Sequence, residues 1–344
     1  MLFKYISRFT KSANPVIIMP YGGYANDTLL HAEARVLEDE GIEHTEEDSF
    51  IKNLYHSYKR FESDEKEGAV VRVSWGNTTK EFISDKEGYI YIDEPHNLDL
   101  RHTETLWMPI TYELINNDKV IYSITSSVMK PPIETEFGII SDLDDTVIHT
   151  GVTSLMKWRV IVNSFMKHSH KRMPLEGVHE FYHLLYKGRS GYNQNPFFYL
   201  SNSPWNLYDY LCTFLQKFSF PKGTLLLRDV GLEHWRKKES FMEGNKFVKI
   251  KHILETYPEI KFILIGDAAD IDADIYTEIA RLFPEQILSI YIRTVRRKSR
   301  TKRVERIIEK NTDIDVVLIE DSNKAIEHAV LKGYVEQEYS KING

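Results

Sequence analysis

Six short apolar runs recur in the second part of the chain, and helix-compatible stretches separate most of them. The runs lie at 137–141, 197–200, 224–227, 262–265, 287–292 and 316–319. A strand that is buried on both faces of a parallel sheet needs such a continuous apolar run. Strands that alternate with helices are typical of a doubly wound α/β domain. This pattern is the strongest constraint that the sequence places on the fold.

The first part of the chain predicts a different, all-β domain. Strand-like segments lie at 16–19, 69–75, 80–83, 89–92, 106–114 and 120–128. Short strands separated by polar turns are typical of a β-sandwich. The polar loop at 84–88 indicates a hairpin between its two flanking segments. The tandem prolines Pro131 and Pro132 mark a boundary, so we predict a sandwich-like domain at 1–132 and an α/β domain at 133–344.

Composition excludes several classes of protein. The formal net charge of −7 argues against a general nucleic-acid binder. Cys212 is the single cysteine, so no internal disulfide can form, and we expect a reducing, cytoplasmic location. No stretch approaches the ~18 apolar residues of a membrane-spanning helix, and we recognise no signal peptide.

Polar residues of particular kinds follow three of the apolar runs. Asp142 and Asp144 follow the first run, Ser201 follows the second, and Asp267 follows the fourth. Because ligands of open α/β sheets bind at the carboxyl ends of the strands, we expect these side chains to meet. Lys246 lies at the start of the helix that precedes the fourth run. The sequence therefore predicts carboxylates, a hydroxyl and a lysine at one edge of the sheet.

This set of groups fits phosphoryl transfer. An aspartate can attack phosphorus and form a covalent intermediate, which divides one difficult step into two easier ones. A second carboxylate two residues later can protonate the leaving oxygen and then activate water. Mg²⁺ takes oxygen ligands and offsets the repulsion between crowded carboxylates and phosphate. A hydroxyl and a lysine can hold the non-bridging phosphate oxygens.

Residues 137–295 resemble the haloacid dehalogenase (HAD-like) superfamily, and more narrowly the phosphatidate phosphatase catalytic domain of the actin-patch-protein type. The matching segments are 141–146, 199–207, 266–276 and 290–293, and 20–37 resembles the opening of bacterial members. The resemblance implies a Rossmannoid parallel sheet with a small helical cap inserted at about 147–195. It also implies a Mg²⁺-dependent phosphatase that acts through an aspartyl-phosphate and converts phosphatidate to diacylglycerol and phosphate. Within that reaction class a soluble phosphomonoester is the alternative substrate, and outside it the alternative is a scaffold without turnover.

The resemblance also implies a role for each matched residue. Asp142 would be the nucleophile and a metal ligand, and Asp144 the general acid/base with its backbone carbonyl on the metal. Ser201 would bind phosphate, and Lys246 would pair with it and with the nucleophile. Asp267 and Asp272 would complete the metal site. Three alternatives stay open, namely Lys249 for the lysine and Asp270 or Asp274 for the supporting carboxylate. The chain departs from the family pattern at Ala268, Ala269 and Thr294.

A competing motif lies at 179–183. His179, Glu180 and His183 match H-E-x-x-H, a zinc-peptidase signature on a helix. Apolar residues at 178, 181, 184 and 185 also give this helix an ordinary core-facing side. We therefore rank a zinc peptidase below the phosphatase.

Two further stretches raise the question of a membrane surface. Residues 153–170 combine apolar and basic side chains, which suits either a helix packed on the domain or a lid that contacts acyl chains. Residues 293–306 hold eight basic side chains and one acidic one, which suits either a solvated helix face or a docking patch for anionic phospholipid. A peripheral membrane association is therefore an open expectation, and protein partners are not predicted.

Overall fold

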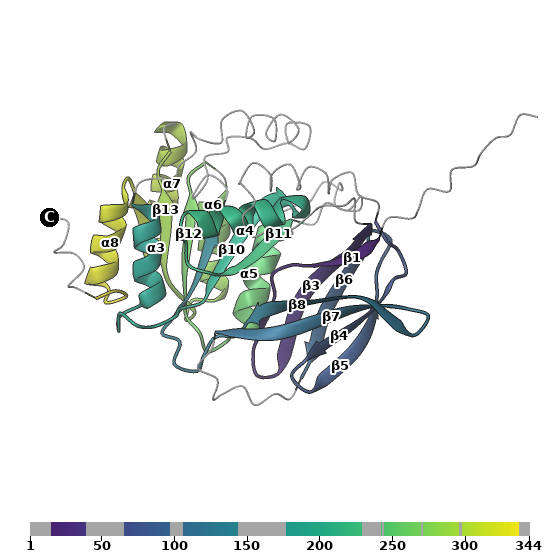
Figure 1. Ribbon diagram of the computed structural model, residues 1–344. Helices are drawn as coiled ribbons and strands as arrows, with labels where there is room; N and C mark the ends of the chain where they lie inside the picture. The colour runs from purple at the N-terminus through teal and green to yellow at the C-terminus, as the bar shows by residue number, and fades with distance from the viewer. Residues whose placement is uncertain are drawn as a thin grey trace, which may run out of the picture.

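The computed structural model describes residues 15–38, 65–96, 106–143, 177–228, 242, 244–269, 271–295 and 298–336. Within these ranges an antiparallel β-rich region precedes a parallel sheet that is covered by helices (Figure 1). This arrangement confirms the mixed architecture that the sequence predicts. No helix within the described ranges is both long and apolar enough to cross a membrane.

The parallel sheet is formed by strands β9 to β14, and every pair in it is parallel. Their order across the sheet is β11-β10-β9-β12-β13-β14. The strands are β9 (Gly138–Asp142), β10 (Phe197–Pro204), β11 (Thr224–Arg228), β12 (Phe262–Asp267), β13 (Ile287–Arg293) and β14 (Val316–Ile319). Each of the six apolar runs lies within or overlaps one of these strands. The order reverses at β9, as in doubly wound sheets, where ligands bind beside the point of reversal.

Helices cover both faces of this sheet. One face carries α3 (Val178–Lys187), α4 (Tyr208–Lys217) and α8 (Ser322–Leu331), and they share a core with the sheet. The other face carries α5 (Asn245–Thr256), α6 (Asp272–Leu282) and α7 (Lys298–Lys310). A short 3₁₀ helix, η2 (Trp205–Leu207), precedes α4. Helix α3 lies inside the range predicted for a cap but packs on the sheet, whereas 144–176 lies outside the described residues.

The N-terminal region forms one connected sheet whose two halves share a core. The strands are β1 (Val16–Pro20), β2 (Tyr24–Ala25), β3 (Leu29–Glu38), β4 (Val70–Trp75), β5 (Thr78–Ile83), β6 (Tyr89–Pro95), β7 (Trp107–Asn116) and β8 (Lys119–Met129). Strands β1, β3 and β6 form one half, β8, β7, β4 and β5 form the other, and β2 joins them. Side chains from both halves enclose one apolar cluster, so the arrangement is sandwich-like.

One predicted pairing in this region is wrong. The loop at 84–88 does not close a hairpin, because β5 pairs with β4 whereas β6 pairs with β3. The tight turn instead lies at Gly76, between β4 and β5. Residues that are close in sequence therefore belong to opposite halves of the sheet.

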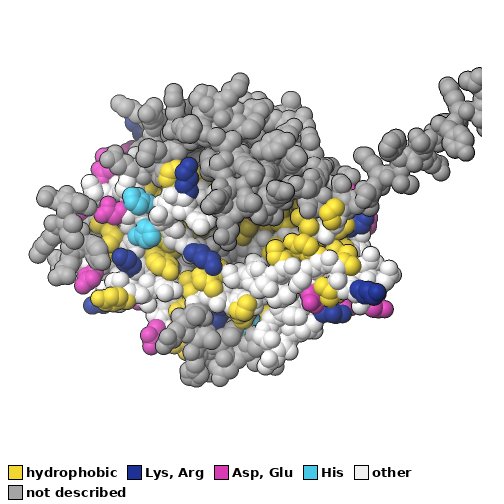
Figure 2. All heavy atoms as spheres, in the orientation of Figure 1, with side chains coloured by type: hydrophobic (Ala, Val, Ile, Leu, Met, Phe, Trp, Pro, Cys, Tyr) yellow, Lys and Arg dark blue, Asp and Glu magenta, His cyan; other side chains and the backbone are white. Residues whose placement is uncertain are grey.

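The two regions pack against each other through the segment around β2. Tyr257 donates a hydrogen bond to the Ala25 carbonyl at 2.9 Å, and Thr224 donates one to the Gly23 carbonyl at 3.0 Å. A Cβ atom on Gly22 would lie 2.5 Å from the Leu225 carbonyl oxygen, so only glycine fits this approach to β11. Figure 2 shows a group of hydrophobic side chains over the N-terminal sheet, with basic and acidic side chains beside it, and a mixture of hydrophobic and charged side chains elsewhere on the visible face.

Candidate active site

Asp142 ends the central strand of the parallel sheet, where the strand order reverses. Strand β9 is buried along its whole length and lies between β10 and β12. The side chain of Asp142 is 1% exposed, and its backbone pairs with Leu200. A carboxylate in such a buried position is stable only when opposite charges or hydrogen bonds compensate for lost hydration.

Lys246 supplies that compensation. Its ammonium lies 3.2 Å from Oδ1 of Asp142 and also forms a short ion pair with Oδ1 of Asp272. The three side chains come from a strand end, the first turn of α5 and the first turn of α6, and none is more than 6% exposed. The sequence prediction that Lys246 lies against the aspartate therefore matches the geometry.

Asp272 links this ion pair to the end of β12. Its Oδ2 accepts a hydrogen bond from the backbone N–H of Asp267 at 3.1 Å. Oδ1 of Asp267 in turn accepts the Ala269 N–H at 2.6 Å, which fixes the loop after the strand. Ile265 pairs with Ser141 on the neighbouring strand, so the Cα atoms of Asp142 and Asp267 are roughly 6 Å apart by standard strand spacing.

Ser201 occupies the corresponding position on the other side of β9. The Leu143 N–H donates to the Leu200 carbonyl at 2.8 Å, which continues the β9–β10 pairing to the strand ends. Ser201 is 5% exposed, and its Oγ accepts the Ser203 N–H at 3.0 Å. Three of the predicted groups, Asp142, Ser201 and Asp267, thus lie on three adjacent strands.

The alternatives left open by the sequence have different surroundings. Lys249 donates a hydrogen bond to the Leu227 carbonyl, and Asp274 forms an ion pair with Arg303 at 2.6 Å. Asp144 and Asp270 lie outside the described residues. Their roles, like the catalytic roles of the other site residues, stay predictions.

The charges at the site favour a protonated lysine. Burial alone would lower the pKa of Lys246, but the nearby carboxylates of Asp272 and Asp142 hold that pKa well above its ordinary value. Lys246 is therefore a cation at neutral pH. At the end of β13, burial lowers the pKa of Arg293, and the negative charge of Asp267 partly opposes this effect.

Two basic side chains of α7 brace the loop that follows Asp267. Arg300 donates a hydrogen bond to the Ala269 carbonyl, and Arg303 pairs with Asp274 on α6. The basic stretch at 293–306 thus has contacts inside the domain. Sequence reasoning missed this role, because charge density alone does not distinguish a bracing helix from a docking surface.

Tyr182 is a second residue near the site that sequence reasoning did not select. Its hydroxyl lies 2.6 Å from Oγ of Ser141, the residue before Asp142. Both side chains are buried, and burial raises the pKa of Tyr182 above its ordinary value, so the phenol stays neutral. This hydrogen bond ties α3 to the end of β9.

The H-E-x-x-H residues do not converge on one point in α3. His179 and Glu180 are exposed, whereas Nε2 of His183 contacts the Ser219 carbonyl. A zinc ion held by this motif needs both imidazoles and a further ligand around it. No such group of three ligands includes these residues in the described part of the chain.

We expect Gly266→Ala to disturb the site through Asp272. A Cβ at position 266 would lie 2.4 Å from Oδ2 of Asp272. That oxygen already accepts the Asp267 N–H, and Oδ1 of the same carboxylate is held by Lys246. Overpacking of this kind lowers the free energy of unfolding by about 1–3 kcal/mol. Urea denaturation and phosphatase assays would measure both effects, and we expect activity to fall about tenfold, the equivalent of 1.4 kcal/mol.

Gly68→Ala is the matched control for this prediction. Gly68 has a positive φ but open space for a methyl group, so its substitution strains the backbone without touching the site. Equal losses of activity in the two variants would contradict the proposed role of the Gly266 contact.

Comparison with known proteins finds a family match for residues 137–294. This segment matches the family model "Phosphatidate phosphatase APP1, catalytic domain". Phosphatidate phosphatase APP1 of Saccharomyces cerevisiae is 35% identical over 160 residues, which are 45% of this chain and 25% of that protein. An uncharacterised protein of Schizosaccharomyces pombe is 28% identical over 215 residues, which are 61% of this chain and 33% of that protein.

The chain thus spans a quarter to a third of the length of these relatives. Among solved structures, a carbohydrate acetylesterase from Xanthomonas citri is 9% identical and covers 89% of this chain and 70% of its own, with a TM-score of 0.33. A similarity at that level supports no conclusion about fold or function.

Proposed function

We propose, on the premise that residues 137–294 belong to the phosphatidate phosphatase APP1 catalytic-domain family, that this chain hydrolyses phosphomonoesters. The observation that carries the proposal is the buried cluster of Asp142, Lys246 and Asp272 at the reversal point of the sheet. Phosphatidate is the proposed substrate, because it is the substrate in the name of the matching relative. Diacylglycerol and inorganic phosphate would be the products.

Asp142 is the proposed nucleophile. A carboxylate oxygen attacks phosphorus, the bond from phosphorus to the ester oxygen breaks, and an aspartyl-phosphate forms. The Lys246 ammonium lies 3.2 Å from Oδ1 of Asp142 and would hold this carboxylate in place for the attack. Asp144 would give a proton to the leaving oxygen and later take one from the attacking water.

Lys246 and Ser201 are the proposed phosphate-binding groups. Lys246 carries a positive charge, and Ser201 offers a hydroxyl donor on the strand next to Asp142. Preorganised donors of this kind stabilise the charge on the non-bridging oxygens as the transition state forms.

The carboxylates at the strand ends fit a Mg²⁺ site. Asp142 and Asp267 are each 1% exposed on neighbouring strands, and carboxylate oxygens are the donors that this ion prefers. Bound Mg²⁺ would neutralise phosphate charge and so allow an anionic nucleophile to approach. Both oxygens of Asp272 already have partners, in Lys246 and the Asp267 N–H, so we favour a positioning role for Asp272 over direct ligation.

A substrate panel tests the proposal. We expect the purified chain to release phosphate from vesicles that contain phosphatidate, and EDTA to suppress the release. A soluble aryl phosphate in the same panel distinguishes a general phosphomonoesterase from a lipid phosphatase. Faster turnover of the soluble ester would favour the alternative substrate class, and no release from either substrate would favour a scaffold.

A further inference from the structure

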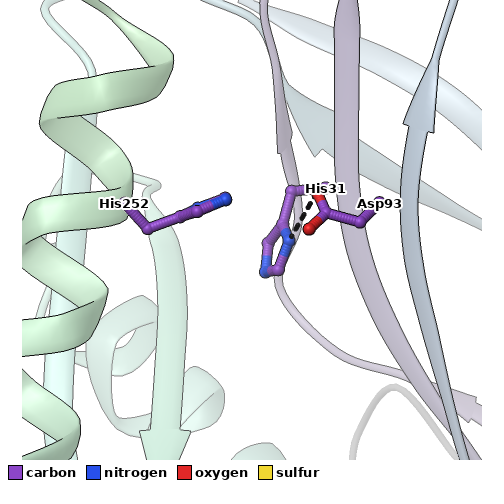
Figure 3. Close-up of side chains that lie close together, drawn as sticks. All are labelled: His31, Asp93 and His252. Atoms are coloured by element: carbon purple, nitrogen blue, oxygen red, sulfur yellow. Dashed lines mark ion pairs between the residues drawn. The ribbon is translucent and has the colours of Figure 1, made fainter.

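Two histidines and an aspartate that are distant in sequence lie together between the two regions of the chain. His31 belongs to β3, Asp93 to β6 and His252 to α5 (Figure 3). One potential ligand atom from each residue lies within 4.8 Å of the other two. Nδ1 of His31 is 3.5 Å from Oδ1 of Asp93, and the two imidazole rings are 4.8 Å apart between centroids. None of these residues belongs to the candidate active site.

The Nδ1 atom of His31, which faces Asp93, is a buried polar atom without a hydrogen bond within the described residues. A buried polar atom without a hydrogen bond destabilises the fold unless another ligand satisfies it. A metal ion at the centre of the three residues would satisfy this atom.

The opposite nitrogens of both imidazoles face groups that would orient them. Nε2 of His31 lies 3.8 Å from Oε1 of Glu33, and Nδ1 of His252 hydrogen-bonds with the Tyr24 hydroxyl at 2.5 Å. Metal-ligating histidines commonly donate their other N–H to a carboxylate, a carbonyl or a similar acceptor. The Tyr24 contact leaves Nε2 of His252 for an ion.

We propose that His31, Asp93 and His252 bind a divalent transition-metal ion of the Zn²⁺ type. Two imidazoles and one carboxylate form a common three-residue zinc ligand set, and water takes the fourth position. Asp93 is 58% exposed, so solvent has access to that position. Tetrahedral zinc ligands are about 3.4 Å apart, so the group must close by roughly 1–1.5 Å, a distance that side-chain rotation covers.

Such an ion would join the N-terminal sheet to helix α5. His31 and Asp93 pair across strands β3 and β6, whereas His252 lies six residues after Lys246 on the helix. The ion would therefore fix the helix that carries the site lysine against the other region. A ligand that binds only the folded state stabilises it, and the melting temperature rises with the logarithm of the ligand concentration over its Kd.

Zinc titration of the full chain tests the proposal. The chain is stripped with EDTA and dialysed, and Zn²⁺ is titrated against a chromophoric chelator in excess Mg²⁺, which occupies sites built only of carboxylates. We expect one Zn²⁺ per chain, and Co²⁺ in its place should give the visible absorption of a tetrahedral centre. Zinc should also raise the melting temperature of the wild type.

Three variants make the test specific. Asp93→Asn changes an exposed residue and should weaken zinc binding at least about tenfold, and His252→Ala should weaken it at least about a hundredfold. His179→Ala, at an exposed histidine on α3, is the matched control and should bind zinc as the wild type does. If His252→Ala does not fold, Asp93→Asn decides the question.

The results that would overturn the proposal are equally definite. The proposal is refuted if the wild-type chain binds no zinc when the free Zn²⁺ concentration is about 100 µM. A site that is still empty at that concentration could not stabilise the fold. Zinc binding that survives unchanged in both Asp93→Asn and His252→Ala would also refute it. Neither result depends on phosphatase activity.

Discussion

Asp142→Asn should lower the rate of phosphate release by at least about 10³-fold, which corresponds to about 4 kcal/mol of transition-state stabilisation. The amide has the size of the carboxylate but lacks its charge, so it cannot attack phosphorus effectively. The fold should persist, because Lys246 keeps its ion pair with Asp272. Phosphate release from phosphatidate vesicles and from an aryl phosphate, both with Mg²⁺, would measure the effect.

Asp118→Asn is the matched control for this prediction. Asp118 is exposed in the turn between β7 and β8, where its positive φ is one that asparagine also tolerates. Its activity should equal that of the wild type. An Asp142→Asn chain that is folded and retains more than about a tenth of the wild-type rate would assign the nucleophile to another residue. Acid-quenched reactions should trap phosphate on the wild-type protein but not on the variant.

The parallel sheet could be predicted from the sequence because each strand is a continuous apolar run. Such runs need burial on both faces, and only a sheet covered by helices on both sides provides it. The apolar run at 262–265, for example, lies in strand β12, which ends at the polar residue Asp267. The strand order across the sheet then brings Asp142, Ser201 and Asp267 together. The proximity of these three residues could be predicted because each follows a strand of the same parallel sheet, whereas their catalytic roles stay predictions.

The N-terminal pairing could not be predicted in the same way. Strands β5 and β6 are separated by a short polar loop, yet β6 pairs with β3, whose paired residues lie 54 to 66 positions earlier. Local turn signals cannot identify the partner of a strand, because the pairing and its register depend on which face of each strand becomes buried. The packing of β2 on β11 and α5 is also absent from any local pattern, since it depends on Gly22 and Tyr24 meeting residues two hundred positions away.

The group of His31, Asp93 and His252 could not be predicted from the sequence either, because its residues are distant in the chain. Metal motifs are recognised in a sequence when their ligands have fixed, short spacings. Here 221 positions separate the two histidines, and only the docking of the two regions brings them together. The H-E-x-x-H segment has the recognisable spacing, yet its two histidines have different surroundings.

Lys246→Met should lower both the stability and the activity of the chain. The substitution leaves the buried carboxylates of Asp142 and Asp272 without their shared cation. Removing one partner of a buried ion pair lowers the free energy of unfolding by about 3–5 kcal/mol. For a domain of this size the melting temperature should fall by roughly 6–20 °C. Because the pKa of Lys246 is raised, the wild type keeps this stabilisation at neutral pH and loses it only as the pH rises through that raised value.

A second substitution separates the structural effect from the catalytic one. Lys246→Met leaves two carboxylates, Asp142 and Asp272, without the lysine. Adding Asp272→Asn removes one of these charges and retains an oxygen that can accept the Asp267 N–H. The Lys246→Met/Asp272→Asn chain should therefore recover part of the lost melting temperature while its activity stays low. If activity returns together with stability, Lys246 serves only the fold.

Lys249→Met decides between the two lysines. Lys249 donates to the Leu227 carbonyl and lies on α5 one turn after Lys246, so its loss should lower stability by about 1 kcal/mol. We expect this variant to keep most of its phosphatase activity, whereas Lys246→Met loses nearly all of it. The reverse result would move the phosphate-binding role to Lys249. The buried ammonium of Lys246 would then serve to neutralise Asp142 and Asp272 in the folded chain.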